Sequence, residues 1–209
     1  MKMAREGWPF LLSSLAFGLA FLALGWWPLA LVFFLLMPAF AFFFRDPKRT
    51  IPPQEHLVLS PADGKIVRID NLASHPNFAG PVNRISIFLS LFDVHLTRAP
   101  LSGTVKDVQY HPGKFLPAYK DGASAGNESN SLVIQSPSAD IFLKQIVGVA
   151  ARRIKCFVKS GAVIRRGQKI GLMYFGSRVE IYLAQEIPLK AGLNDKVRAG
   201  ETVIAEVQQ

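Results

Sequence analysis

The chain has 209 residues, of which half are apolar, and its formal net charge at pH 7 is +9. That length suits one domain of ordinary size with an appended segment. The single cysteine, Cys156, excludes an internal disulfide and fits a reducing compartment. Because Cys156 lies in the strand-like run IKCFV, the pattern favours a core position over a nucleophile. The positive charge excludes neither nucleic acid nor an anionic membrane as a partner, and the placement of apolar residues decides between them.

An uncharged stretch runs from Gly7 to Phe44. As one straight helix it would be about 57 Å long, roughly twice the thickness of a bilayer's hydrocarbon core. Gly25-Trp26-Trp27-Pro28, near its middle, is typical of a turn with interfacial aromatic residues. The turn leaves two apolar arms, 9–24 and 29–44. We therefore predict an N-terminal hydrophobic helical hairpin that is either spanning or re-entrant.

Basic residues flank this stretch on both sides, namely Lys2, Arg5, Arg45, Lys48 and Arg49. Positive charge stays on the cytoplasmic side of membranes, so both ends of the hairpin are expected there. The segment RDPKRT (45–50) is expected to lie among anionic headgroups, which accounts for the charge without nucleic acid. A signal peptide is the alternative, but the stretch is too long and lacks a small-residue cleavage site. We predict a cell-membrane anchor at 1–50 and a cytoplasmic-face domain at 51–209.

After Pro52-Pro53 the chain alternates short apolar runs with Gly, Pro, Asn and Asp. Many short strands with Gly-rich turns indicate a mainly β fold with a β-sandwich or barrel-sandwich-like core. The expected strands are 57–60, 65–69, 84–90, 104–110, 131–136, 141–147, 153–158, 169–175, 178–184 and 202–207.

Three clusters in the β domain carry chemistry: Asp63 in SPADGK, His95 in FLSLFDVHLTRAP, and Gly176-Ser177 in GLMYFGSRVEIYL. Each has an ordinary structural interpretation, as a turn aspartate, a core histidine and a strand bulge. Together they can form an activated nucleophile. The histidine would take the hydroxyl proton, and the aspartate would fix the histidine tautomer and stabilise its charge.

Other catalytic and metal-binding patterns are absent from the sequence. There is no GxSxG elbow, no HExxH or CxxC pair and no GxxxxGK[ST] loop. The four histidines, His56, His75, His95 and His111, are too scattered to read as ligands. We expect no metal site.

Several segments resemble the phosphatidylserine decarboxylase proenzymes of the short bacterial and archaeal type. The resemblance covers about residues 42 to 184 and includes FFFRDPKRTIP, SPADGKI, SIFLSLFDVHLTRAP, SGTVKDVQYHPGKF, GNESN and FGSRVEIYL. DVHxxRAP and FGSRV, in this order and at this separation, are specific, whereas either alone would be weak. The hydrophobic N-terminal segment also fits this family.

The resemblance implies that the chain cleaves itself between Gly176 and Ser177. Ser177 Oγ attacks the Gly176 carbonyl, and the resulting ester is converted into a pyruvoyl group at residue 177, while Asp63 and His95 assist. The fragments 1–176 and 177–209 form a heterodimer, with any further dimerisation left open. The pyruvoyl carbonyl forms a Schiff base with the amine of phosphatidylserine and acts as an electron sink as CO2 leaves.

The resemblance also suggests Arg98 and Lys114 as ligands of the lipid phosphate, on motif position alone. The longer branch of the family has two histidines in the equivalent segment. Here His95 matches the first and Arg98 replaces the second, so His95 could serve both self-cleavage and decarboxylation. Asn127 and Glu128 partly match the family's Asn-Glu loop, and a loop or turn role is expected for both.

Three alternatives remain at this point. A membrane-anchored barrel-sandwich adaptor would need a long helical hairpin inserted in the β domain, and no such periodic segment is present. A biotinyl or lipoyl carrier would need a lysine displayed at a hairpin tip, and no lysine stands out in that way. A pyruvoyl decarboxylase of a soluble amino acid would not need the apolar N-terminal segment.

Overall fold

The computed structural model describes residues 2–116, 126–148, 153–174 and 177–208. Its internal contacts divide the chain into two compact units, Met1–Lys48 and Arg49–Gln209. The division falls after Lys48, close to the predicted boundary after residue 50. Each unit is described by itself.

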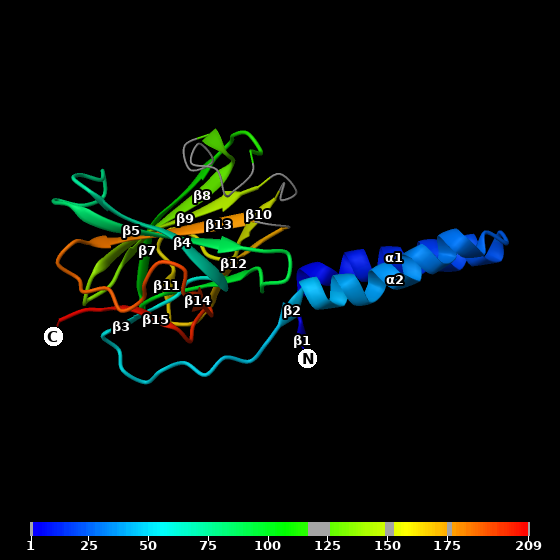
Figure 1. The fold of residues 1–209 in the computed structure, drawn as a ribbon, viewed down its shortest axis with the longest axis horizontal. Helices are drawn as coiled ribbons and strands as arrows, with labels where there is room; N and C mark the ends of the chain where they lie inside the picture. Colours follow the sequence, from blue (N-terminus) through cyan, green and yellow to red (C-terminus); the bar gives the residue numbers. More distant parts are fainter. Residues whose placement is uncertain (1, 117–125, 149–152, 175–176, 209) are drawn as a thin grey trace. The chain divides into compact units, whose positions relative to one another are not determined.

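The N-terminal unit is a helical hairpin, as the turn signal at residues 25–28 predicts. Helices α1 (Trp8–Ala23) and α2 (Trp27–Phe43) run side by side (Figure 1). Gly25 adopts a φ of 76° in the turn, a conformation that glycine reaches without strain. The Ser14 hydroxyl donates to the Phe33 carbonyl at 2.6 Å, so this polar group is satisfied between two apolar helices.

The two ends of the hairpin are joined to each other. Strands β1 (Lys2–Met3) and β2 (Arg45–Asp46) pair antiparallel, and the 3-10 helix η1 (Arg5–Gly7) leads into α1. The basic flanks therefore lie at the same end of the hairpin. By length and composition, the described helical segment Arg5–Ala23 suffices to cross a membrane, while Trp27–Phe43 is shorter.

The second unit is built on one large antiparallel sheet that curls around its core (Figure 1). Its strand order is β11-β7-β8-β9-β13-β5-β4-β14. The strands are β11 (Val163–Ile164), β7 (Gly103–His111), β8 (Ser129–Gln135), β9 (Asp140–Val147), β13 (Ser177–Ala184), β5 (Val82–Leu89), β4 (Gly64–Leu72) and β14 (Lys196–Val197).

Two smaller sheets complete this unit. One has the order β10-β12-β6 and the other pairs β15 with β3. The strands are β10 (Ile154–Cys156), β12 (Lys169–Met173), β6 (Leu96–Arg98), β15 (Val203–Glu206) and β3 (Leu57–Leu59).

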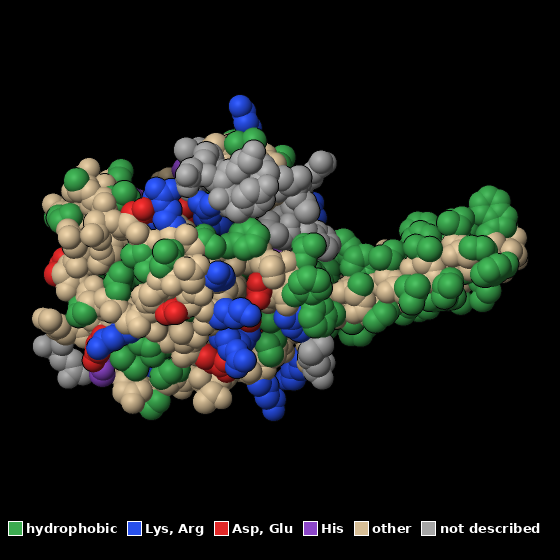
Figure 2. Space-filling view, viewed as in Figure 1, with side chains coloured by type: hydrophobic (Ala, Val, Ile, Leu, Met, Phe, Trp, Pro, Cys, Tyr) green, Lys and Arg blue, Asp and Glu red, His purple; other side chains and the backbone are tan. Residues whose placement is uncertain are grey.

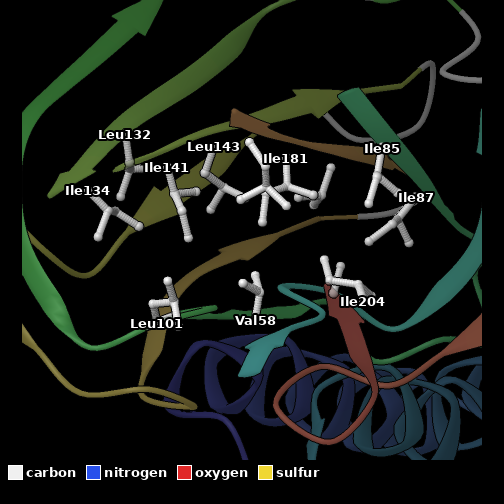
Figure 3. Close-up of a cluster of buried hydrophobic side chains, with 14 of the residues drawn as sticks. Val58, Ile85, Ile87, Leu101, Leu132, Ile134, Ile141, Leu143, Ile181 and Ile204 are labelled. Atoms are coloured by element: carbon white, nitrogen blue, oxygen red, sulfur yellow. The ribbon is translucent and has the colours of Figure 1, made fainter. Parts of the chain in front are cut away.

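The hydrophobic core lies between the large sheet and the small ones. Alternate residues of β13, such as Val179 and Ile181, enter it because successive side chains of a strand point to opposite faces. Figure 3 shows side chains of the large sheet facing Val58 of β3 and Ile204 of β15. This layered packing confirms the mainly β prediction. Burying each such aliphatic side chain contributes about 1.5–3 kcal/mol.

All ten predicted strands are present, with ends shifted by a few residues. The additional short strands β1, β2, β6, β11 and β14 were not predicted, because two or three residues give no readable alternation. Two of them matter for the site: β6 follows His95 directly, and β14 extends the edge of the large sheet beside β4.

Gly64 is required where β4 begins. Its φ is 145°, and a Cβ atom at this position would lie 2.1 Å from the Phe88 carbonyl oxygen on β5. The glycine thus lets the Asp63 turn approach the end of β5 closely, where a larger residue would strain the backbone and separate the strands.

We predict that Gly64→Ala lowers the free energy of unfolding by about 2 kcal/mol or more, because it adds both backbone strain and overlap. Gly80→Ala is the matched control, since its Cβ meets nothing within 4 Å, and it should change stability by less than about 0.5 kcal/mol. Thermal unfolding of the full chain in detergent, followed by the β-sheet circular dichroism signal, measures both. Equal losses in the two variants would contradict the assignment.

Candidate active site

Ser177 is the first residue of the central strand β13. It pairs with Leu89 on one side and Val147 on the other. The residue is fully buried, and its Oγ has no hydrogen-bond partner among the described residues. A buried hydroxyl without a partner costs about 1–3 kcal/mol, so such a group in a native fold calls for an explanation, of which a chemical role is one. Gly176, the predicted scissile residue, lies outside the described residues.

His95 lies beside the strand that leads toward Ser177. It directly precedes β6, and the Met173 N–H at the end of β12 donates to the His95 carbonyl at 3.1 Å. From Met173 the chain reaches Ser177 in four residues. The His95 side chain is completely buried, so water does not compete for its contacts.

A polar contact between the sheets supports the same placement. The Gln145 amide of β9 donates to the Thr97 hydroxyl of β6 at 2.6 Å, and both residues are buried. His95 precedes Thr97 by two residues, and Val147, the partner of Ser177, follows Gln145 by two. The structure therefore brings the His95 segment to the end of the sheet that holds Ser177.

The His95 tautomer is set by its own turn. Nδ1 lies 3.0 Å from the Asp93 carbonyl oxygen, and because a carbonyl only accepts, Nδ1 donates; in the neutral imidazole the lone pair is then on Nε2. The Asp93 carboxylate in turn accepts from the Ser90 N–H at 2.8 Å and from its hydroxyl at 2.6 Å. This fixed turn, rather than the expected Asp63 carboxylate, makes the described tautomer-setting contact, since Asp93 is only two residues from the ring.

Asp63 is held by a different set of partners. Its carboxylate accepts from Arg49 Nη2 at 2.9 and 2.8 Å and from the Ala199 N–H at 2.8 Å. Only 6% of the Arg49 side chain is exposed, so this is a nearly buried ion pair. The expectation that RDPKRT lies among headgroups is therefore wrong for Arg49, because its guanidinium is turned inward to Asp63.

Glu201 completes this cluster. It accepts from the Thr50 N–H at 2.9 Å and from Arg49 Nη1 at 3.4 Å. The Thr50 N–H, followed by the charge of Arg49, holds the pKa of Glu201 below its usual range. Residues 49–50, the Asp63 turn and the loop before β15 thus meet at one buried guanidinium.

The remaining residues singled out in the sequence are Arg98, Lys114, Asn127 and Glu128. The Arg98 guanidinium donates to the Gly167 carbonyl at 2.9 Å, and Lys114 forms a backbone bridge to Asn127. The buried Asn127 side-chain amide donates to the Val147 carbonyl at 2.7 Å, which places this loop beside the strand partner of Ser177. Glu128 is also buried, and its carbonyl accepts from the Val147 N–H at 3.1 Å.

The sequence analysis missed an ionic cluster on β13 that begins at Arg178, the residue after Ser177. Arg178 is almost fully buried and lies 3.5 Å from Glu180, which also accepts from the Tyr182 hydroxyl at 2.8 Å. Burial, reinforced by Glu180, raises the pKa of Tyr182, while burial lowers the pKa of the neighbouring Lys144. The alternation Arg178, Glu180, Tyr182 was a readable signal, because polar residues at every second position mark one face of a strand.

A cleft of about 600 Å³ opens beside the Ser177 end of the sheet. Phe88 and Ser90 line it, and these two residues flank Leu89, the strand partner of Ser177. Its remaining lining residues are Asp63, Gly64, Lys65, Phe92, Asp93, Lys196, Val197 and Arg198. The cleft thus joins the Asp63 turn to the turn that fixes His95.

Comparison with known proteins gives a consistent result. A family model described as phosphatidylserine decarboxylase matches residues 36–205. The chain is 43% identical over 209 residues to the phosphatidylserine decarboxylase proenzyme of Burkholderia vietnamiensis, covering 99% of this chain and 97% of that relative. The proenzyme of Burkholderia lata is 42% identical over 208 residues, with the same coverage. These matches give no support to the adaptor or carrier alternatives.

We predict that Arg49→Ala lowers the free energy of unfolding by roughly 3 kcal/mol, because the nearly buried Asp63 carboxylate loses its ion-pair partner. Arg198→Ala is the matched control. Arg198 also faces Glu201, but at 4.0 Å and with 75% of its side chain exposed, so its loss should cost less than about 1 kcal/mol. Urea unfolding in detergent compares the two, and equal effects would contradict a buried structural role for Arg49.

Proposed function

The chain belongs to the phosphatidylserine decarboxylase family, and from this premise we propose that it is a proenzyme that cleaves itself between Gly176 and Ser177. The mature protein then converts phosphatidylserine into phosphatidylethanolamine and CO2. The observation that carries the proposal is the Ser177 hydroxyl, which is fully buried at the start of β13 and has no hydrogen-bond partner among the described residues.

His95 is the general base that we propose for self-cleavage. With the proton held on Nδ1 by the Asp93 carbonyl, Nε2 is the basic atom that takes the Ser177 hydroxyl proton. Ser177 Oγ then attacks the Gly176 carbonyl carbon, and the peptide C–N bond breaks as the proton held by His95 passes to the departing nitrogen. An ester then joins the two parts of the chain, and residue 177 carries a free amine. Loss of the Ser177 Cα proton expels Gly176 as a carboxylate, and water replaces the nitrogen at residue 177 as ammonia leaves.

Asp63 acts in this proposal through its place at the cleft. Its carboxylate is fixed by Arg49 and by the Ala199 N–H, so it keeps a constant position while the chain breaks nearby. Asp63 thereby assists by holding the turn at this end of the sheet in place, while its charge is balanced by Arg49.

The two fragments remain together because of the sheet. β13 belongs to the fragment 177–209 and is paired along both edges, with β9 and β5 of the other fragment. Breaking one peptide bond before Ser177 leaves these ladders intact. The mature protein is therefore a heterodimer whose new N-terminus begins inside the fold.

Residue 177 also fits the cofactor that we propose. A pyruvoyl group there would supply the carbonyl that takes up the substrate amine and accepts the electron pair released with CO2. Residue 177 is fully buried, so the group would be shielded from bulk solvent. Such shielding strengthens the electrostatic interactions of a developing negative charge.

A membrane location accords with the N-terminal unit. Helix α1 is apolar, and the pairing of β1 with β2 puts both basic flanks at one end of the hairpin. That arrangement favours an anchor whose ends lie on the cytoplasmic face, since Lys and Arg are retained there. The substrate is itself a membrane lipid, so an anchored enzyme meets it at the headgroup layer.

We predict that Ser177→Ala abolishes self-cleavage, because it removes the attacking oxygen. On a denaturing gel the parent should give two bands and the variant one. Ser86→Ala, which changes another fully buried serine of the same sheet, is the matched control and should still give two bands. A parent that stays whole and still decarboxylates phosphatidylserine would refute the proposal.

His95→Ala should slow self-cleavage by at least about 100-fold, since general-base assistance is worth 10²–10⁴-fold. His111→Ala is the control. His111 of β7 contacts Ser131 of β8 at 3.2 Å, and β7 is three strands away from β13 in the sheet. The cleaved fraction is followed over time after synthesis, with circular dichroism confirming the fold. Normal maturation of a folded His95→Ala variant would remove His95 from this role.

A further inference from the structure

The cleft beside Ser177 carries three cationic side chains, Lys65 of β4, Lys196 of β14 and Arg198, which follows β14. We call this feature the lysine cleft. In Figure 2, Lys and Arg side chains gather over the region where Figure 1 places β4 and β14. No predicted site residue other than Asp63 lies among its lining residues, and the family resemblance suggested different cations.

The charge of the lysine cleft is available to a ligand. Lys65 and Lys196 are exposed, and within the described part of the chain neither has an ion-pair partner. Among the described residues, the Arg198 guanidinium pairs with Glu201 at 4.0 Å, and 75% of the Arg198 side chain is exposed, so this contact is weak.

The two carboxylates in the cleft do not cancel this charge. Asp63 is bonded to Arg49 and to the Ala199 N–H. The Asp93 carboxylate is bonded to the Ser90 N–H and hydroxyl. With both acceptors engaged, the cleft presents ammonium and guanidinium donors, which bind phosphate oxygens well.

The strand register connects the lysine cleft to residue 177. Lys196 pairs with Lys65, Lys65 with Phe88, and Phe88 with Arg178, which directly follows Ser177. Paired residues point to the same face, so these side chains form one row across β14, β4, β5 and β13. Strands lie about 4.8 Å apart, which puts the Lys65 backbone roughly 10 Å from β13.

That separation matches a phosphoserine headgroup. Its phosphorus and amine nitrogen are separated by four bonds, a span of about 5 Å, and a lysine side chain reaches about 6 Å from its Cα. The Ser177 side chain points to the core face, opposite the row. The carbonyl carbon that receives the amine would derive from the Cα of residue 177, a backbone atom at the strand end that is not confined to one face.

One edge of the lysine cleft is apolar. Phe92, which lines the cleft, is 77% exposed, and its neighbour Leu91 is 53% exposed. Both lie in the turn that Asp93 fixes. Aromatic and aliphatic residues exposed beside cations are typical of surfaces that meet the headgroup layer of a membrane. Inorganic phosphate would make no favourable contact with these apolar side chains, whereas the acyl chains of a lipid would.

We propose that the lysine cleft binds the phosphate of the substrate lipid, with Lys65 and Lys196 as direct ligands, Arg198 at the entrance and Leu91-Phe92 facing the apolar layer. The proposal rests on the proposed function, because it assigns the substrate's phosphate to a place beside residue 177. It replaces Arg98 and Lys114 as phosphate ligands. Specificity for a phospholipid over a soluble amino acid then resides in this cleft.

Lysine labelling tests the binding directly and needs no catalysis. The full-length Ser177→Ala chain in neutral detergent is acetylated with or without dihexanoyl phosphatidylserine, and mass spectrometry measures each lysine. We expect the lipid to slow labelling of Lys65 and Lys196 at least about threefold and to leave Lys106, exposed on β7 at the other end of the strand order, unaffected. Dihexanoylglycerol, which lacks the phosphate, should protect neither lysine.

Two results of the labelling experiment would overturn the proposal. One is no protection of Lys65 and Lys196 by the phosphatidylserine. The other is equal protection by inorganic phosphate at the same concentration, which would make the cleft a site for free phosphate rather than for a lipid headgroup.

Kinetics test the same residues in the active enzyme. Lys65→Gln and Lys196→Gln should each raise KM for phosphatidylserine in mixed micelles by about fivefold or more, and lower kcat by a smaller factor, because each removes a charged phosphate ligand. Lys106→Gln, with the same loss of charge, should change KM by less than about twofold. Equal KM changes in all three variants would show only a general charge effect and would overturn the proposal.

The two experiments separate this proposal from the function on which it rests. If the parent enzyme fails to decarboxylate phosphatidylserine, the proposed function is wrong, and the labelling of Ser177→Ala still decides whether the cleft binds the lipid. If the parent is active but Lys65 and Lys196 are neither protected nor needed for a low KM, the phosphate assignment alone is wrong.

Discussion

Strand β13 must be hydrogen-bonded along both edges from its first residue, because it is the fifth of eight strands in a sheet whose inner face is the core. This pairing fixes the backbone of residue 177 between Leu89 and Val147. A side chain at that position is necessarily buried, and its hydroxyl must find a partner or remain without one. Ser177 is left without one among the described residues, and the proposed chemistry starts from that state.

The same pairing explains how the fold can stay assembled after a peptide bond is cleaved next to a central strand of its largest sheet. The proposed scissile bond precedes Ser177, and every β13 residue in the described ladders follows it, so the break removes none of these pairs. The Asp63 cluster adds a second link between the fragments. Arg49 and Asp63 belong to the segment before the break, whereas Ala199 and Glu201 belong to the segment after it. Losing this cluster would loosen the cleft and the fragment interface together.

Much of the fold could be predicted from the sequence, because long apolar runs and alternating strands leave local signals. The ten main strands and the helical hairpin have such signals. Strand β14 does not, since two residues carry no period, and its pairing with β4 depends on distant packing. The lysine cleft could not be predicted from the sequence for that reason. Lys65 and Lys196 are 131 positions apart and become neighbours through this pairing.

The candidate site shows the same division. Asp63, His95 and Ser177 were found because they sit in recognisable motifs. Their partners were not, because side-chain contacts depend on geometry. Arg49 was expected at the membrane surface from its basic neighbours, yet its guanidinium is turned inward to Asp63. Asp93 lies two residues from His95, and a sequence cannot show that its carbonyl, rather than a distant carboxylate, reaches the imidazole.

The central claim is that Ser177 becomes the cofactor, and the mass of the fragment 177–209 tests it most directly. The account predicts a fragment lighter than the serine-initiated peptide by one ammonia molecule, which gains two hydrogen atoms on reduction with borohydride as decarboxylation is lost. An active enzyme whose fragment begins with an unmodified serine, or whose chain is not cleaved at all, would contradict it.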